Sequence, residues 1–341
     1  MSLDLPLVWA VIIATAVLMY VLLDGFDLGV GALFPFATDE ERDVMTASIA
    51  PVWDGNETWL VLGGGGLFAA FPLAYAVLMP AFYIPITLML AALIFRGVAF
   101  EFRAHGRRRG RRFWTWAFSG GSILAVLAQG LVLGAFVHGV TTRGRGFAGE
   151  PFDWLTPFAV LTAVSLTLGY ALLGAGWLVI KTEGELHEKA KRWSRALSVA
   201  VALAMALVSL ATLSVNPEVT QRWGVSMTVV DWSRLLPLTP APLLGAAGLA
   251  LVFFTTAPHA APRHAPYLGA AAAFLSGYAG LAISIAPYVA PYRFTFREAA
   301  AADNALGFLL FGVAILLPVI LAYTAYVYWV FRGKASIEHG Y

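Results

Sequence analysis

Long apolar runs, separated by short polar segments, follow one another along the whole chain. A helix needs about 20 consecutive apolar residues to cross a bilayer, and nine runs come near that length. They cover 6–33, 57–78, 80–101, 114–138, 155–180, 195–215, 239–257, 266–287 and 304–331. The glycine-rich run 57–78 and the short run 239–257 are the weakest. The pattern predicts an all-α polytopic membrane protein with nine transmembrane helices.

The second and third runs almost touch at Met79 and Pro80, so a tight turn is expected there. Prolines 72, 80 and 85 indicate that this region is bent rather than one long helix. Elsewhere no internal repeat is visible, and the longest loop, about 216–238, is too short for a soluble domain. Residues 1–341 are therefore expected to form a single transmembrane domain.

Composition agrees with this class. The chain is 60% hydrophobic and 12% charged, whereas a soluble domain carries about 25% charged residues. The absence of cysteine excludes disulfides, iron–sulfur clusters and thiolate metal ligands. The N-terminus lacks the basic segment of a cleavable signal peptide, so the first helix is expected to remain in the mature protein.

The distribution of lysine and arginine predicts the orientation. Of the 22 basic residues, fifteen fall in the odd-numbered predicted loops and the C-terminal tail, and six in the even-numbered loops. Arg96 lies inside a predicted helix. Because cytoplasmic loops are enriched in basic residues, the N-terminus is expected outside and the C-terminus in the cytoplasm.

The histidines argue against a haem site within this chain, because membrane haems take axial ligands from helix interiors. The six histidines fall in predicted loops, tails or helix ends: His105, His138, His187, His259, His264 and His339. Met19, Met89 and Met205 lie inside predicted helices, where methionine ordinarily serves packing. The chain is therefore predicted to bind no haem or transition metal by itself.

Two pairs of carboxylates accompany the first two apolar runs. Asp24 and Asp27 are three residues apart, so they share a helical face near the end of the first run. Asp54 and Glu57 have the same spacing at the start of the second run. By the predicted topology, all four lie on the cytoplasmic side.

These carboxylates allow two compatible interpretations. Asp54 or Asn56 could cap the second helix and satisfy its free N–H groups. Alternatively, carboxylates in a wet crevice at the membrane edge can relay protons. Both interpretations remain open at this point.

Arg96 and Glu101 lie near the cytoplasmic end of the third run. Arg96 could extend to the interface, or it could pair with a carboxylate such as Asp24 or Asp54. The basic run RAHGRRRGRR (103–112) is expected to touch anionic lipid rather than nucleic acid. The polar segment 182–195 is expected to be a solvated connector in which Glu185 pairs with Lys189.

Four segments together match a known pattern. They are DGFDLGVGALFPF from Asp24, SIAPVWDGNETWLVLGGGGLFAAFPLAYA from Ser48, LIFRGVAFEFR from Leu93 and KTEGELHEKAKR from Lys181. In sequence and spacing they resemble subunit II of the cytochrome bd-type quinol oxidases, including the cyanide-insensitive branch. The match is dense over 20–103 and thinner over 180–195 and the final helix, and about 200–300 adds no motif.

The resemblance implies a complex of the bacterial inner membrane that oxidises quinol and reduces dioxygen to water. It implies nine helices, arranged as two four-helix bundles plus one peripheral helix. The partner would be the haem-bearing subunit I, which carries haems b and d and the quinol-oxidising loop. This chain would hold no redox centre. Whether it binds a structural quinone, and whether a small single-helix third subunit joins, stays open.

The resemblance also implies a role for the aspartates. The acidic residue of the WDGN block, here Asp54, is implicated in a proton route at the subunit interface, and Asp24 matches the first aspartate of the DGFD block. Asp27 and Glu57 join them as candidates through their spacing. The predicted topology places these residues where proton uptake from the cytoplasm is needed.

Two other functions compete with this interpretation. Glycine-interrupted helices and intramembrane charges also occur in ion-coupled secondary transporters, although there the charges gather at the midplane. A purely structural partner of subunit I, without a proton role, is the third possibility. Transport by the isolated chain would favour the first rival, and full turnover after replacing Asp54 with Asn would favour the second.

Overall fold

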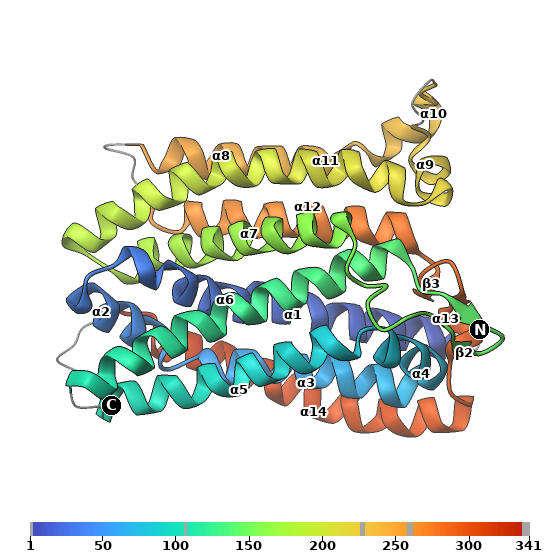
Figure 1. The fold of residues 1–341 in the computed structure, drawn as a ribbon, viewed down its shortest axis with the longest axis horizontal. Helices are drawn as coiled ribbons and strands as arrows, with labels where there is room; N and C mark the ends of the chain where they lie inside the picture. The colour runs from blue at the N-terminus through green and yellow to red at the C-terminus, as the bar shows by residue number, and fades with distance from the viewer. Residues whose placement is uncertain (1–2, 106–107, 226–228, 258–261, 336–341) are drawn as a thin grey trace.

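The computed structural model describes residues 3–105, 108–225, 229–257 and 262–335, and these residues are almost entirely helical. Long helices run side by side along the longest axis of the molecule (Figure 1). The helices are α1 (Leu5–Leu33), α2 (Asp39–Ile49), α3 (Trp53–Ala70), α4 (Pro72–Ala81), α5 (Tyr83–His105), α6 (Arg108–His138), α7 (Pro157–Lys181), α8 (Gly184–Val215), α9 (Pro217–Trp223), α10 (Trp232–Leu235), α11 (Pro240–Thr255), α12 (Ala265–Ile285), α13 (Phe296–Ala299) and α14 (Asp303–Val330), with short 3₁₀ turns at Phe34–Phe36 and Leu236–Leu238.

The two ends of the bundle differ. One end, called the α2 end here, holds α2, the junction of α7 with α8 and the C-terminal segment (Figure 1). The other, called the hairpin end, holds the N-terminus and two small antiparallel hairpins. The hairpins are β1 (Thr142–Arg143) with β2 (Gly146–Phe147), and β3 (Tyr288–Ala290) with β4 (Phe294–Thr295). The connections between successive long helices therefore lie alternately at one end of the bundle and at the other.

Within the described ranges, seven helices are long and apolar enough to cross a membrane, or eight if one bent pair counts as a single span. The seven coincide with predicted runs. The bent pair joins Trp232–Leu238 to Pro240–Thr255 at 45° and takes the place of the short run 239–257. The nine spans predicted from the sequence are thus confirmed in seven or eight cases.

The remaining run, 57–78, corresponds to α3 and α4. Its glycines lower its hydropathy, and the helix breaks at Phe71, the residue before Pro72, since a residue preceding proline disfavours the helical conformation. The turn predicted at Met79 and Pro80 is wrong, because α4 continues through Pro80 to Ala81. The bends predicted from the prolines are present, but they lie at Phe71 and Phe82.

Backbone-to-backbone contact joins α1 to α7 at the centre of the bundle. A methyl group added at Gly29 would lie 1.8 Å from the carbonyl oxygen of Tyr170, and one added at Gly174 would lie 2.5 Å from the carbonyl carbon of Gly29. Small residues permit such close approach of membrane helices. Phe26 then stacks on Trp177 at 4.2 Å between ring centroids. The acidic last third of α1 is therefore held tightly against the core.

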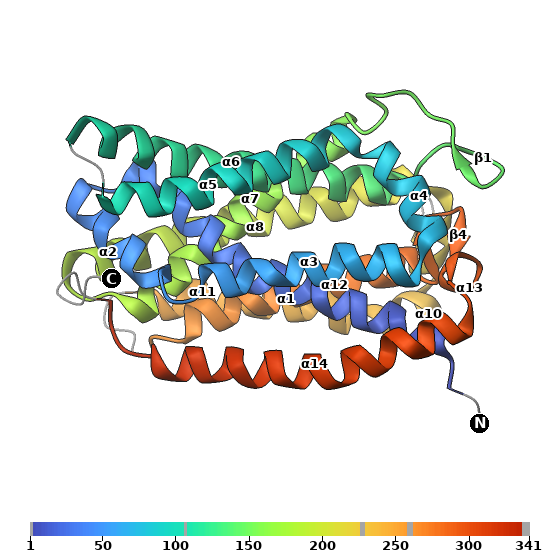
Figure 2. The ribbon, with the colours of Figure 1, turned by 90° about the horizontal axis from the view of Figure 1, so that it is seen from below.

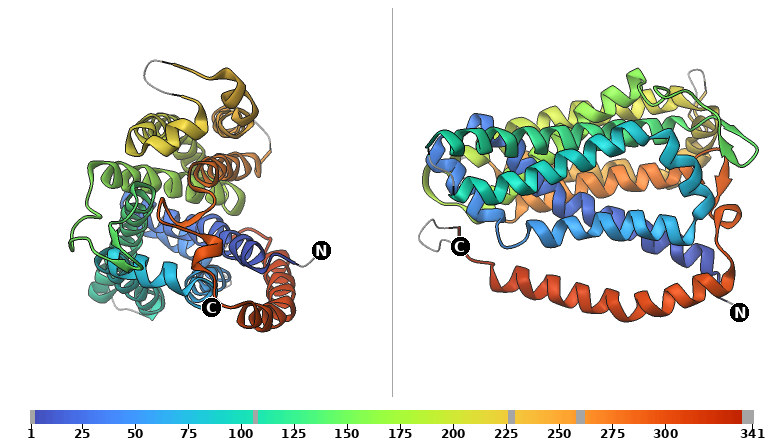
Figure 3. Two further views of the ribbon diagram at one scale, coloured as in Figure 1. Left: turned by 90° about the vertical axis from the view of Figure 1, so that its right-hand side faces the viewer. Right: turned by 60° about the horizontal axis from the view of Figure 1, so that its bottom comes forward.

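Helix α14 lies at the edge of the bundle (Figures 2 and 3). Only 6% of its most apolar window is buried inside the chain. Its first turn receives a hydrogen bond from the Trp9 indole to the carbonyl of Leu306, at 3.1 Å. At the α2 end, Lys181 donates to the carbonyls of Phe331 and Gly333. The helix is thus attached by polar contacts near its two ends.

Candidate functional site

A buried cluster of charges lies where α1, α3 and α5 meet. Asp24 and Asp27 are 0% exposed and Arg96 is 1% exposed. Arg96 Nη1 donates to Asp24 Oδ1 at 2.9 Å and lies 3.7 Å from Glu57 Oε2. The extension of Arg96 to the interface, considered from its position in the sequence, is therefore wrong. The contact at 2.9 Å confirms the alternative, a pairing of Arg96 with Asp24. Such a pair is expected here, because ionised groups at this depth are tolerated only when they are paired.

Asp27 belongs to a second, adjoining arrangement. Asn56 Nδ2 donates to Asp27 Oδ2 at 2.7 Å, and Tyr328 donates its hydroxyl proton to Asn56 Oδ1 at 2.8 Å. Asn56 is 1% exposed, and its amide joins α1, α3 and α14. The capping interpretation is wrong, because the residue before α3 is Val52 and the start of the helix has no side-chain cap.

Exposure falls step by step along the carboxylates. Asp54 lies exposed in the first turn of α3, where a negative charge interacts favourably with the helix dipole. Glu57, one turn further, keeps 28% of its side chain exposed, and Asp24 is fully buried. Glu101, the other acidic candidate, lies exposed on α5, and the ion pairs of Arg96 run to Asp24 and Glu57 instead.

Several polar atoms of the cluster have no hydrogen-bond partner within the described part of the chain. They are Asp24 Oδ2, Asp27 Oδ1 and two nitrogens of Arg96, Nε and Nη2. Buried polar atoms in proteins are normally paired with protein or with ordered water. These unpartnered atoms are therefore suited to bind water. Carboxylates that are linked through bound water can pass protons to one another.

The residues that could bind a metal or haem are placed differently. Among the described residues, no group of three or more His, Asp or Glu side chains is close enough to hold a metal ion. His105 and His138 close α5 and α6, His187 lies in the first turns of α8, and His264 precedes α12. His259 and His339, like Arg107 of the basic run, lie outside the described residues. The assignment of haem to a partner subunit stays a prediction.

A second charge cluster fastens α2 to the bundle. Arg103 Nη2 donates to Asp43 at 2.7 Å, and Arg111 also donates to this carboxylate. Burial raises the pKa of Asp43, but hydrogen bonds from Arg111 and Arg103 outweigh burial and hold that pKa below its usual value. Lys189 pairs with Glu41 at 2.6 Å. Most of the segment predicted as a solvated connector, 182–195, is therefore the start of α8. The partner of Lys189 is Glu41 on α2, and not Glu185 as predicted.

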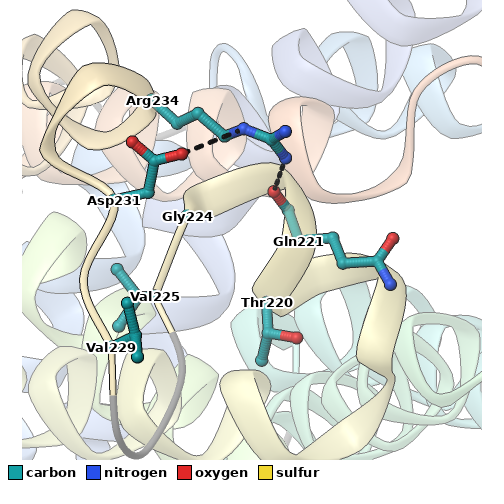
Figure 4. A pocket seen from close by; sticks show the side chains of 7 residues that line it. All are labelled: Thr220, Gln221, Gly224, Val225, Val229, Asp231 and Arg234. Carbon is teal, nitrogen blue, oxygen red and sulfur yellow. Dashed lines mark hydrogen bonds and ion pairs between the residues drawn. The ribbon is translucent and has the colours of Figure 1, made fainter.

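Two cavities lined by described residues lie at the hairpin end, far from the acidic last third of α1. Figure 4 shows one of about 200 Å³ beside α9 and α10, in which Arg234 contacts Asp231 at 3.3 Å and the carbonyl of Gln221 at 3.0 Å. A neighbouring cavity of about 490 Å³ is lined by Arg222, which lies 3.6 Å from Glu218. Each arginine already has a carboxylate partner, so this region is not the candidate site.

Sequence reasoning missed Asn56 and Tyr328 as members of the site. Asn56 stood inside the acidic block and was considered only as a cap. Tyr328 lies near the end of the last predicted span, where aromatic residues ordinarily mark the membrane interface. A polar amide next to a membrane span is itself a signal, because such groups form hydrogen bonds between helices.

Known proteins resemble this chain in both sequence and fold. The family model described as cytochrome bd terminal oxidase subunit II matches residues 5–331. Cytochrome bd-I ubiquinol oxidase subunit 2 of Escherichia coli strain K12 is 29% identical, covering 98% of this chain and 96% of that protein. Cytochrome bd ubiquinol oxidase subunit 2 of Bacillus subtilis strain 168 is 26% identical, covering 96% of each. The fold is similar to a chain in the structure of bd oxidase from Geobacillus thermodenitrificans, with a TM-score of 0.74, 16% identity and coverage of 97% and 100%.

Proposed function

The chain belongs to the cytochrome bd terminal oxidase subunit II family, and from this we propose that it takes up protons for a quinol-oxidising, dioxygen-reducing complex of the bacterial inner membrane. The relatives from Escherichia coli and Bacillus subtilis are ubiquinol oxidase subunits, which supports quinol as the reductant. On this proposal, haems b and d belong to subunit I, because the described histidines of this chain sit at helix ends.

The graded burial of three carboxylates carries the proposal. Asp54 takes a proton from water at the α2 end, Glu57 receives it half-way into the protein, and Asp24 holds it at full depth. Arg96 contacts both inner carboxylates, and its positive charge makes their ionised forms tolerable in the membrane. Asp27 adjoins this path through Asn56.

The outer face of α3 supports an interface with subunit I at the same place. A methyl group added at Gly64 or Gly65 would meet nothing within 4 Å, so these two neighbouring glycines serve no contact within the described part of the chain. Glycines on one helical face permit close approach of a second membrane helix. Asp54 and Gly65 are eleven residues apart, close to three full turns, and therefore lie on the same side of α3. A partner packed on this side would border the entrance of the proton path.

The same proposal completes the topology. The α2 end is cytoplasmic, since the loops and tail that gather there carry fifteen of the 22 basic residues, and the N-terminus lies outside. Helices α3 and α4 together form the ninth span, supported by their course along the bundle (Figure 3). The nine spans form two four-helix bundles, with α14 as the peripheral helix.

The test replaces Asp54 with Asn in the complex with subunit I. Turnover and proton uptake are expected to fall about tenfold or more, while the haem spectrum stays intact, because the charge and proton acceptor at the entrance are lost. Glu40→Gln is the matched control, since it also removes an exposed carboxylate at the α2 end. Full turnover of an assembled Asp54→Asn complex would exclude the proton role of Asp54.

A further inference from the structure

A hydrogen-bond chain of three side chains, the buried Tyr20 and Tyr170 with the partly buried Gln129 between them, reaches the carboxylate cluster from the side of α6 and α7. The Tyr170 hydroxyl donates to Gln129 Oε1 at 3.0 Å, and Gln129 Nε2 donates to the Tyr20 hydroxyl oxygen at 2.7 Å. Tyr20 is 4% exposed and Tyr170 is 0% exposed. Tyr20 precedes Asp24 by one turn of α1, so the two side chains share a helical face.

The hydrogen bonds in this chain all run in one direction. A glutamine amide has one oxygen that accepts and one nitrogen that donates. Because Tyr170 donates to the oxygen of Gln129, the nitrogen of Gln129 faces Tyr20. The oxygen of Tyr20 accepts that bond, and its own proton remains for a further acceptor.

Asp24 is the acceptor next to that proton. The Tyr20 hydroxyl approaches the Asp24 carboxyl closely enough to interact with it. Asp24 Oδ1 is occupied by Arg96, whereas Oδ2 has no partner within the described residues. The hydrogen-bond chain therefore ends in a donor that lies next to a carboxylate with one unpartnered oxygen. The other charged groups around Asp24 are Arg96 on α5, Glu57 on α3 and Asp27 on α1.

We propose that Tyr20 is a positioning residue for Asp24, and that Gln129 and Tyr170 fix the direction in which Tyr20 donates. The proposal rests on the proton-uptake function of Asp24 given above. A side-chain amide is a poor acid and a poor base. Gln129 therefore orients the hydrogen bonds of Tyr170 and Tyr20 without passing protons between them. The same three residues therefore hold Asp24 in place and close the proton path toward α6 and α7.

The test compares single hydroxyl deletions in the complex with subunit I. Tyr20→Phe keeps the ring and removes the hydroxyl, which is both the donor next to Asp24 and the acceptor of the Gln129 amide. Tyr278→Phe is the matched control, because its hydroxyl donates to the carbonyl of Ala14 at 2.6 Å, likewise tying another helix to α1. Tyr170→Phe removes the hydroxyl at the other end of the hydrogen-bond chain, which reaches Tyr20 only through Gln129.

The direct readout is the infrared band of the Asp24 carboxyl, identified by its loss in Asp24→Asn. We expect the band to move in Tyr20→Phe, to move less in Tyr170→Phe and to stay in place in Tyr278→Phe. An unmoved band in Tyr20→Phe overturns the proposal, whatever happens to turnover.

Turnover supplies the second readout. Loss of a hydrogen bond to a charged group is expected to slow turnover of Tyr20→Phe about tenfold and to shift its pH profile, with the quinol KM unchanged. Asp24→Asn combined with Tyr20→Phe should be no slower than Asp24→Asn alone; additive slowing overturns the proposal. If the band moves in Tyr20→Phe but Asp24→Asn turns over as fast as the wild type, proton uptake through Asp24 is refuted and the positioning role of Tyr20 stands.

Discussion

Helix α5 carries two buried arginines, seven residues apart and therefore about 10 Å along the axis, that illustrate two uses of the same side chain. Each of the three nitrogens of Arg103 donates a hydrogen bond, to Thr115, Thr46 and Asp43. Arg96 donates one, to Asp24, and its Nε and Nη2 have no partner within the described chain.

The difference separates a structural arginine from one suited to function. A fully satisfied buried network is rigid and specifies one arrangement, and Arg103 accordingly ties α2 and α6 to α5. An incompletely satisfied network costs stability, and natural proteins carry such sites mainly where function requires them. On the proposed function, the charges around Arg96 exchange partners and protons because their hydrogen-bonding capacity is not used up.

The largest expected effect follows from Arg96→Met. Asp24 and Asp27 would remain buried without a positive neighbour, and leaving a buried charge unpaired costs roughly 3–5 kcal/mol. We expect a large fall in the melting temperature of the purified complex together with loss of turnover. Arg297→Met, which breaks an exposed pair with Asp4, should leave both quantities unchanged. Wild-type stability in Arg96→Met would mean that the cluster does not depend on its arginine.

Arg103→Met should have a smaller effect, limited to stability. Asp43 keeps Arg111 as a partner and remains 26% exposed to water, so the loss is expected to be about 1–3 kcal/mol. Thermal unfolding measures it, and quinol oxidase turnover at a temperature where the variant is folded should match the wild type. A turnover as low as that of Arg96→Met would erase the distinction drawn between the two arginines.

The smallest effect is a pH dependence at the α2 end. The pKa of Asp43 lies below its usual 3.8 in the folded protein, so the unfolded chain binds the proton more readily. The stabilisation is therefore complete above about pH 4 and is lost as the pH falls through the folded pKa. The protection factors of the α2 amides in hydrogen exchange, taken relative to an unprotected amide at the same pH, should fall below that pH. In Asp43→Asn this acid-induced change should be weaker, and an unchanged acid response would assign it to other carboxylates.

Sequence reasoning identified the transmembrane runs wherever apolar length was sufficient. It misplaced the turn after the second run, because a proline in the first or last turn of a helix interrupts few hydrogen bonds. Pro80 lies next to the last residue of α4 and leaves that helix intact. The break at Phe71 depends instead on the residue that precedes Pro72.

The acidic residues of the candidate site were predictable from the sequence, but Asn56, Tyr328 and the contacts that join them to the carboxylates were not. Asp24, Asp27, Asp54 and Glu57 stand out because charges are rare in such apolar runs. The partner of Arg96 lies 72 positions away in the sequence, and only helix packing brings the two together. Extension of Arg96 to the interface was a reasonable interpretation of position alone, and the close contact of α1 with its neighbours excludes it.

The link from Tyr328 through Asn56 to Asp27 has a consequence for biosynthesis. Chains are made from the N-terminus, so Asp27 and Asn56 have left the ribosome long before Tyr328 is added. Until then the Asn56 carbonyl must find a temporary partner. The acidic cluster thus acquires its final hydrogen bonds only after α14 has been made, so the synthesis of α14 is a condition for a finished site.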